Sequence, residues 1–220
     1  VVYQLESAIV VANTLTVTPA SSTETLDTVN GSSFAITTKN LTVGVSGTLT
    51  AWSSLITITG GAWDTSAGQF NSVTSTIEFS ATGTLKTVTS GGVRTVYNLT
   101  VDLGATVTLV SGIGVGNVIT VNGTLAISTL NVFIRNENGT TDPIVVGASG
   151  AFSGTLGSAF ISFFDQAGTR DNIPAAVYTG INFTFDPAVA VAGDGFEYRI
   201  MGNISSAQWS FSYRAADPFF

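Results

Sequence analysis

The chain has 220 residues and contains neither cysteine nor histidine, which excludes disulfides, thiolate chemistry, histidine metal sites and serine–histidine–aspartate catalysis. Charged residues make up 10% of the sequence and the net charge is −7, with seven scattered basic residues, so the clustered basic surface that nucleic acid requires is missing. No apolar run approaches the roughly 20 residues of a membrane-spanning helix, and we expect no transmembrane segment.

Residues 1–20 are predicted to form a terminal strand. The chain begins with Val1 rather than Met, which we interpret as a processed mature chain. The segment 9–17 is rich in β-branched residues, and we expect it to be donated to the sheet of a neighbouring subunit. Pairing within its own domain is the alternative. The predicted interface residues are Ile9, Val10, Val11, Leu15 and Val17.

Residues 21–130 are predicted to form a repetitive β region. Polar and apolar residues alternate at 54–59 and 106–110, which indicates strands with one buried face. Gly-Thr-Leu begins at Gly47, Gly83, Gly123 and Gly154. Its intervals predict pairs of solenoid turns of roughly 15 to 20 residues each.

The stretches 79–84, 88–92, 96–101, 107–109 and 119–125 form a degenerate repeat, in which Asn98-Leu99-Thr100-Val101 repeats the tetrapeptide that starts at Asn40. Over about residues 36–130 this repeat resembles those of large secreted microbial surface proteins with a right-handed β-helix, the haemagglutinin-like and related adhesins. The resemblance implies a β-solenoid and a role at a surface, and it identifies no site.

Two all-β architectures fit the strand pattern. In a right-handed β-helix, which we favour, short strands stack at about 4.8 Å and inward Val, Leu and Ile form ladders. In a β-sandwich with a donated N-terminal strand, the same signals alternate between two sheets. Residues 131–220 contain most of the phenylalanines, and we expect them to form a second packing layer or a cap.

Few residues suggest bound groups. Weak calcium candidates are the carboxylates of Asp165, Asp171, Asp194 and Glu197, although turns of Asp and Gly explain these residues equally well. No other cofactor is expected. N-linked glycans would solvate a nearly uncharged surface, and the Asn-X-Ser/Thr triplets begin at Asn30, Asn40, Asn98, Asn122, Asn138, Asn182 and Asn203.

We expect a non-enzymatic, extracellular structural subunit of a filament, pilus or surface layer. Its partners would be copies of itself, joined head to tail by strand addition, with the C-terminal Phe219 and Phe220 also at the interface. A glycan-binding adhesin or viral fibre domain is the first alternative, with sugar rings stacked on Trp52, Trp63, Tyr97 and Trp209. A polysaccharide-cleaving β-helix enzyme is the second, and it requires Asp64, Glu78 and Asp102 on one face.

Overall fold

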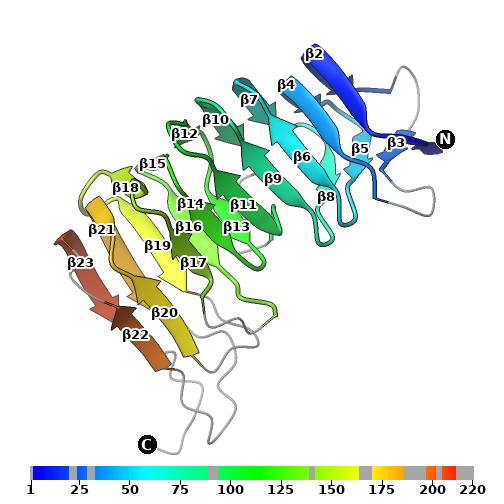
Figure 1. Cartoon of the computed structure of the whole chain (residues 1–220). Coiled ribbons are helices and arrows are strands. Elements are labelled where there is room, and N and C mark those ends of the chain that lie inside the picture. The colour runs from blue at the N-terminus through cyan, green and yellow to red at the C-terminus, as the bar shows by residue number, and fades with distance from the viewer. Residues whose placement is uncertain are drawn as a thin grey trace, which may run out of the picture.

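The computed structural model describes residues 2–19, 24–28, 33–88, 94–138, 142–163, 170–185, 197–201 and 205–211. Within these residues the chain contains strands and turns but no helix, and every pair of neighbouring strands is parallel. The strands stack into a right-handed β-solenoid whose first strands and last strands lie at opposite ends (Figure 1). The predicted β-helix is therefore confirmed, and the β-sandwich with a donated strand is wrong.

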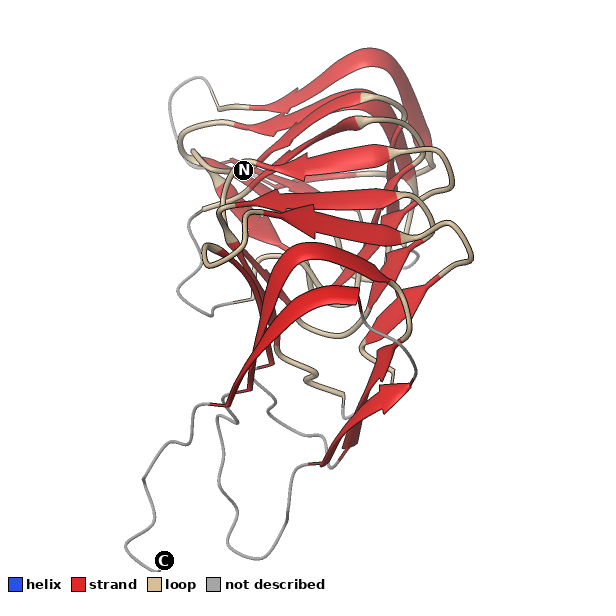
Figure 2. Ribbon diagram, turned by 90° about the vertical axis from the view of Figure 1, so that its left-hand side faces the viewer, coloured by secondary structure: helices blue, strands red, loops and turns tan. Residues whose placement is uncertain are grey.

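Each turn of the solenoid contributes strands to faces that we call A, B and C, and these faces surround a common interior (Figure 2). Face A stacks β6 (Leu55–Ile58), β9 (Thr76–Phe79), β11 (Asn98–Val101), β14 (Ile119–Val121) and β17 (Ile144–Val146). Face B stacks β7 (Gly61–Asp64), β10 (Gly83–Lys86), β12 (Thr106–Leu109), β15 (Thr124–Ser128) and β18 (Ala151–Gly154).

Face C is built from two groups of paired strands. The first group is β1 (Val2–Gln4), β3 (Glu24–Asp27), β5 (Gly47–Thr50) and β8 (Gln69–Asn71). The second is β13 (Ile113–Val115), β16 (Asn131–Ile134) and β19 (Ala159–Phe163). At the N-terminal end, β2 (Ile9–Val17) and β4 (Ile36–Val43) extend across faces A and B, because β4 pairs with both β6 and β7.

The last turns continue the same stacking. Strand β21 (Val177–Phe185) pairs with both β18 and β19, and β23 (Ser205–Phe211) pairs with β21. Strand β20 (Arg170–Pro174) pairs with β22 (Glu197–Met201). Because β18 pairs with β15 and β19 with β16, strand pairing is continuous across residue 131, where the sequence predicted a change of region.

The core consists of ladders of inward side chains. On face A, fully buried residues occupy the same position in successive turns: Ile36, Ile56, Ile77, Leu99 and Ile119. The residue that follows each of them points outward, as strand alternation requires, and is mostly threonine. In the later turns the ladders become aromatic: the Phe152 and Tyr178 rings stack at 5.0 Å between centroids, and those of Phe163 and Phe185 at 5.3 Å.

In most turns the solenoid repeat is longer than the sequence predicted, although the pairing of Leu99 with Ile119 and of Val107 with Leu125 falls within the predicted interval. The hydrogen bonds Thr57–Glu78 and Asn98–Thr76 join residues 21 and 22 apart in neighbouring turns. The spacing of the Gly-Thr-Leu tripeptides does not give the repeat length, because the copies do not lie at equivalent positions in successive turns. Gly47 begins β5 on face C, whereas Gly83 begins β10 on face B, so their interval is not a whole number of turns.

Candidate functional site

The N-terminal end of the solenoid presents a strand with one free edge. Strand β2 pairs with β4 of its own chain, and within the described residues it pairs with nothing on its other side. Strand β1 likewise pairs with β3 alone in this part of the chain. The terminal strand therefore pairs within its own solenoid, which is the alternative that the sequence left open. Strand β2 lies at the end of the stack (Figure 1), and its outer edge is unpaired among the described residues.

Inward side chains at this end are incompletely covered. Ile9 and Leu15 are half-buried, whereas their partners one turn further on, Ile36 and Leu41, are fully buried. The difference arises because each turn of a solenoid covers the inward apolar side chains of the turn stacked against it. A parallel strand added to β2 would bury the first rung in the same way.

The other predicted interface residues differ from one another in their exposure. Val11 is half-buried, but Val17 is only 8% exposed and is already covered by its own chain. Val10 is 80% exposed because alternation turns it outward on face A. Phe219 and Phe220 lie outside the described residues.

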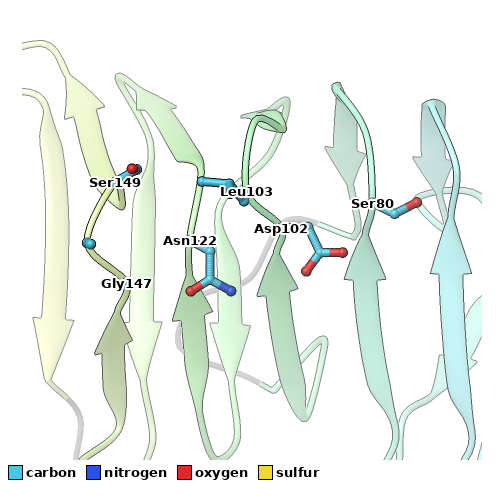
Figure 3. A pocket seen from close by; sticks show the side chains of 7 residues that line it. Ser80, Asp102, Leu103, Asn122, Gly147 and Ser149 are labelled. Atoms are coloured by element: carbon cyan, nitrogen blue, oxygen red, sulfur yellow. The ribbon is translucent and has the colours of Figure 1, made fainter.

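A second feature is a groove with both polar and apolar lining on the corner between faces A and B. Its volume is about 520 Å³, and it is lined by Ser80, Asp102, Leu103, Asn122, Gly147, Ala148 and Ser149. Ser80, Asp102, Asn122 and Gly147 each follow a face A strand, so they occupy equivalent places in successive turns (Figure 3). The groove therefore runs along the solenoid axis.

The groove exists because the corners differ in length. The corner at 122–123 is shorter than those at 102–105 and 147–150 on either side of it. Both longer corners are closed turns, with backbone hydrogen bonds of 3.0 Å from Ala105 to Asp102 and 2.9 Å from Gly150 to Gly147. Asn122 therefore forms the floor of the groove, and the side chain of Leu103, which is 73% exposed, forms part of one wall.

The sequence points to Asn122 as a glycosylation site and to Asp102 as a catalytic carboxylate. No sequence motif singles out Ser80, Leu103 or Ser149. The difference in corner length between neighbouring turns indicates the groove. This difference becomes visible in the sequence only when the strands of successive turns are aligned with one another.

The predicted carboxylate triad is only partly assembled. Asp64 lies on face B, where Lys86 donates a hydrogen bond to it at 3.3 Å and the two form an ion pair. Glu78 lies on face A, and its pKa is raised, first by burial and then by the charge of Asp102, against a weak 3.4 Å hydrogen bond from Thr57. Glu78 and Asp102 are therefore close enough to interact, but Asp64 is not part of that pair.

Among the described side chains, the predicted sugar-stacking aromatics do not form a platform. Trp63 is fully buried in the core and its ring meets that of Phe70 edge-on, and Tyr97 is buried as well, so both predictions are wrong. Trp52 is 44% exposed, and its indole nitrogen donates a 2.7 Å hydrogen bond to Asp27. The side chain of Trp209 lies outside the described part of the chain.

Several predicted glycosylation sites use their side chains inside the fold. Asn182 is 4% exposed, and its amide nitrogen, the atom that a glycan would occupy, donates a 2.8 Å hydrogen bond to the Ala159 carbonyl oxygen. Asn182 has no room for a glycan in the folded chain. Asn40 bridges turns by accepting from the Ala62 N–H at 2.9 Å and donating to Thr14 at 3.3 Å.

The remaining triplets are more varied. Asn98 accepts a 2.9 Å hydrogen bond from Asn117, Asn138 is exposed and donates to the Tyr97 hydroxyl, and Asn122 lies in the groove. Asn30 and Asn203 are not among the described residues. Glycosylation at these positions stays a prediction.

A calcium site at the four acidic residues stays a prediction. Asp165 and Asp194 fall outside the described residues, and for Asp171 and Glu197 only the backbone, in β20 and β22, is described. Among the described residues, no group of three or more acidic side chains could hold a metal ion. The described part of the chain also contains no helix long and apolar enough to cross a membrane.

Comparison with family models, curated proteins and solved structures finds no match to this chain. Two features of the structure therefore bear on function: the open edge of β2 and the groove.

Proposed function

We propose that this chain is an extracellular structural subunit that stacks end to end with copies of itself into a filament or a surface layer. The observation that supports the proposal best is the outer edge of β2, which is unpaired within the described residues and lies above half-buried Ile9, Val11 and Leu15. A parallel strand from a second copy would satisfy the free backbone groups and cover these side chains in one step.

The two ends of the solenoid are compatible with such stacking. Within the described residues, β23 pairs only with β21, so the far end also presents a strand with one open edge. Because all neighbouring strands are parallel, joining the last turn of one copy to the first turn of the next continues the same pattern. The contact would be heterologous and would not close on itself, which produces a linear polymer.

The composition supports an extracellular location. With 10% charged residues, the surface is solvated chiefly by threonine, serine and asparagine, and N-linked glycans at exposed asparagines would add to this solvation. Glycans are therefore part of the proposal, attached away from the stacking ends.

The backbone of β2 allows a specific test. The Ile9 N–H donates to the Ala35 carbonyl oxygen at 3.0 Å, toward β4. Backbone groups of successive strand residues point to opposite sides, so those of Val10 point to the open edge. Val10→Pro removes an edge donor and no hydrogen bond within the described part of the chain, and proline is tolerated at an exposed edge.

The experiment compares the wild-type chain, Val10→Pro and Val10→Thr by electron microscopy and light scattering. Threonine keeps the N–H and is the residue at the paired position in β4, Thr37. We expect polymers from the wild-type chain and Val10→Thr, and folded monomers from Val10→Pro with nearly unchanged thermal unfolding. A monomeric wild-type chain, or polymers of Val10→Pro equal to those of the wild-type chain, would contradict the proposal.

A further inference from the structure

We propose that the groove on the corner between faces A and B binds a neutral oligosaccharide that lies along the solenoid axis. This site is separate from the assembly surface: its residues come from the turns between β9 and β18, whereas assembly uses the terminal strands. The inference does not depend on whether the chain polymerises.

The size and direction of the groove fit a short, extended chain. Its volume of about 520 Å³ lies within the roughly 300–1,000 Å³ typical of ligand sites. From Ser80 to Gly147 it crosses the paired strands β9, β11, β14 and β17. At about 4.8 Å per strand spacing, that length is roughly 14 Å. A linear oligomer matches this shape better than a single compact molecule does.

The lining offers the groups that sugar hydroxyls need. Asp102 supplies carboxylate oxygens as acceptors, Asn122 supplies both a donor and an acceptor, and Ser80 and Ser149 supply hydroxyls. Within the described chain, the side chains of Asp102, Asn122 and Ser149 have no protein hydrogen-bond partner, and that of Ser80 makes only a 3.4 Å contact with the Ile58 carbonyl oxygen. Asp102, Asn122 and Ser149 can therefore pair with a ligand without breaking a hydrogen bond within the protein, and Ser80 would give up only a long one.

The apolar part of the lining matches the other face of a sugar. Leu103 and Ala148 occupy equivalent positions in the two longer corners, on opposite sides of Asn122. Pyranose rings present C–H groups on one face and hydroxyls at their edges, so apolar walls above a polar floor suit them.

Charge selects neutral saccharides over acidic ones. The groove contains Asp102, the carboxylate of Glu78 lies nearby, and no lysine or arginine lines it. A uronate or a sulfated sugar would bring a negative charge next to these carboxylates with no cation to pair with it.

The test titrates the unglycosylated chain with cellohexaose, xylohexaose and mannohexaose, and separately with oligogalacturonate and with calcium chloride, followed by calorimetry and amide NMR shifts. An unglycosylated chain is needed because a glycan on Asn122 would occupy the groove. We expect at least one neutral hexasaccharide to bind and to shift the amide resonances of 102–105 and 147–150, and we expect no binding of oligogalacturonate.

Variants identify the site. Asp102→Asn and Asn122→Ala should each weaken binding by about tenfold, the loss expected for one good hydrogen bond. Leu103→Ser should weaken it too. The matched controls are Asn131→Ala, on the outer side of face C, and Leu156→Ser, in the exposed turn after β18, and both should leave binding unchanged.

Three results would overturn the inference. The first is no binding by any neutral hexasaccharide at millimolar concentration. The second is equal weakening of binding by the controls and the groove variants. The third is a response of the groove resonances to calcium or oligogalacturonate alone, which would assign a cation site or an anionic ligand instead.

Discussion

Replacement of Phe152 by alanine tests the register of β18 in the solenoid. Phe152 is fully buried on face B, in a ladder in which it pairs with Leu125 on one side and Tyr178 on the other. Its ring stacks on that of Tyr178 at 5.0 Å and an interplanar angle of 16°. Because the strands on both sides are held at about 4.8 Å by backbone hydrogen bonds, the ladder cannot collapse into the space that alanine leaves.

We therefore expect a cost near the upper part of the range for buried aromatics, about 4 kcal/mol in the free energy of unfolding. The neighbouring Ser153 points outward by strand alternation, and Ser153→Ala should change stability by less than about 0.5 kcal/mol. Urea unfolding followed by circular dichroism measures both. Hydrogen exchange of β15 and β21 shows whether the loss spreads to neighbouring turns, as it does in repeat proteins.

A shift of β18 by one residue would exchange the two side chains between core and surface. A loss below about 1.5 kcal/mol for Phe152→Ala, or an equal loss for Ser153→Ala, would therefore refute the register and the ladder model of the core.

Three further predictions concern single contacts. Glu137 accepts hydrogen bonds from Arg94 at 2.6 Å and from Arg135 at 3.1 Å, so Glu137→Gln should lower Tm by roughly 3–6 °C in calorimetry; an unchanged Tm would mean that the pairs contribute nothing. A Cβ at Gly83 would lie 2.2 Å from a backbone carbonyl oxygen on β7, so Gly83→Ala should cost roughly 2–3 kcal/mol in urea unfolding, and a neutral effect would contradict the close approach of β7 and β10. Because the pKa of Glu78 is raised above 4.5, this carboxyl group stays protonated to a higher pH in the folded chain than in the unfolded chain. Its contribution therefore lowers the free energy of unfolding as the pH rises from 4.5 through the folded pKa. Glu78→Gln should remove that part of the pH dependence and be at least as stable as the wild-type chain at pH 7; a less stable variant would show that the ionised carboxylate is stabilising.

The fold was predictable because alternation determines which side chains face inward. In 106–110 and 54–59, β-branched and apolar residues alternate with threonine and serine, and the structure buries Val107, Leu109, Ile56 and Ile58. The same pattern occurs on every face, however, so it says nothing about which face a strand joins. The tetrapeptide Asn-Leu-Thr-Val ends β4 on face B and forms β11 on face A.

The candidate sites were less predictable because they depend on contacts between turns. Nothing local to Trp63 indicates that it faces the core, and only its pairing with Leu41 and Leu85 places it in a ladder. The buried Asn182 reads as an ordinary glycosylation triplet until its amide is found bonded to Ala159. The sequence predicts a terminal strand at 9–17, because this segment is rich in β-branched residues. The sequence does not determine that this strand pairs with β4 of the same chain.

The solenoid keeps assembly and ligand binding physically separate. The corner lengths that create the groove differ between turns, yet the pairing of Leu99 with Ile119 and of Ile119 with Ile144 stays in register across them. Stacking requires only a matching strand edge at each end, so groove residues can change without altering the terminal turns. It follows that Val10→Pro should abolish polymers and leave saccharide affinity unchanged, whereas Asn122→Ala should weaken saccharide binding and leave polymers intact. If either variant changed both properties, the groove and the ends would have to be coupled through the stack, and the assignment of separate roles to them would fail.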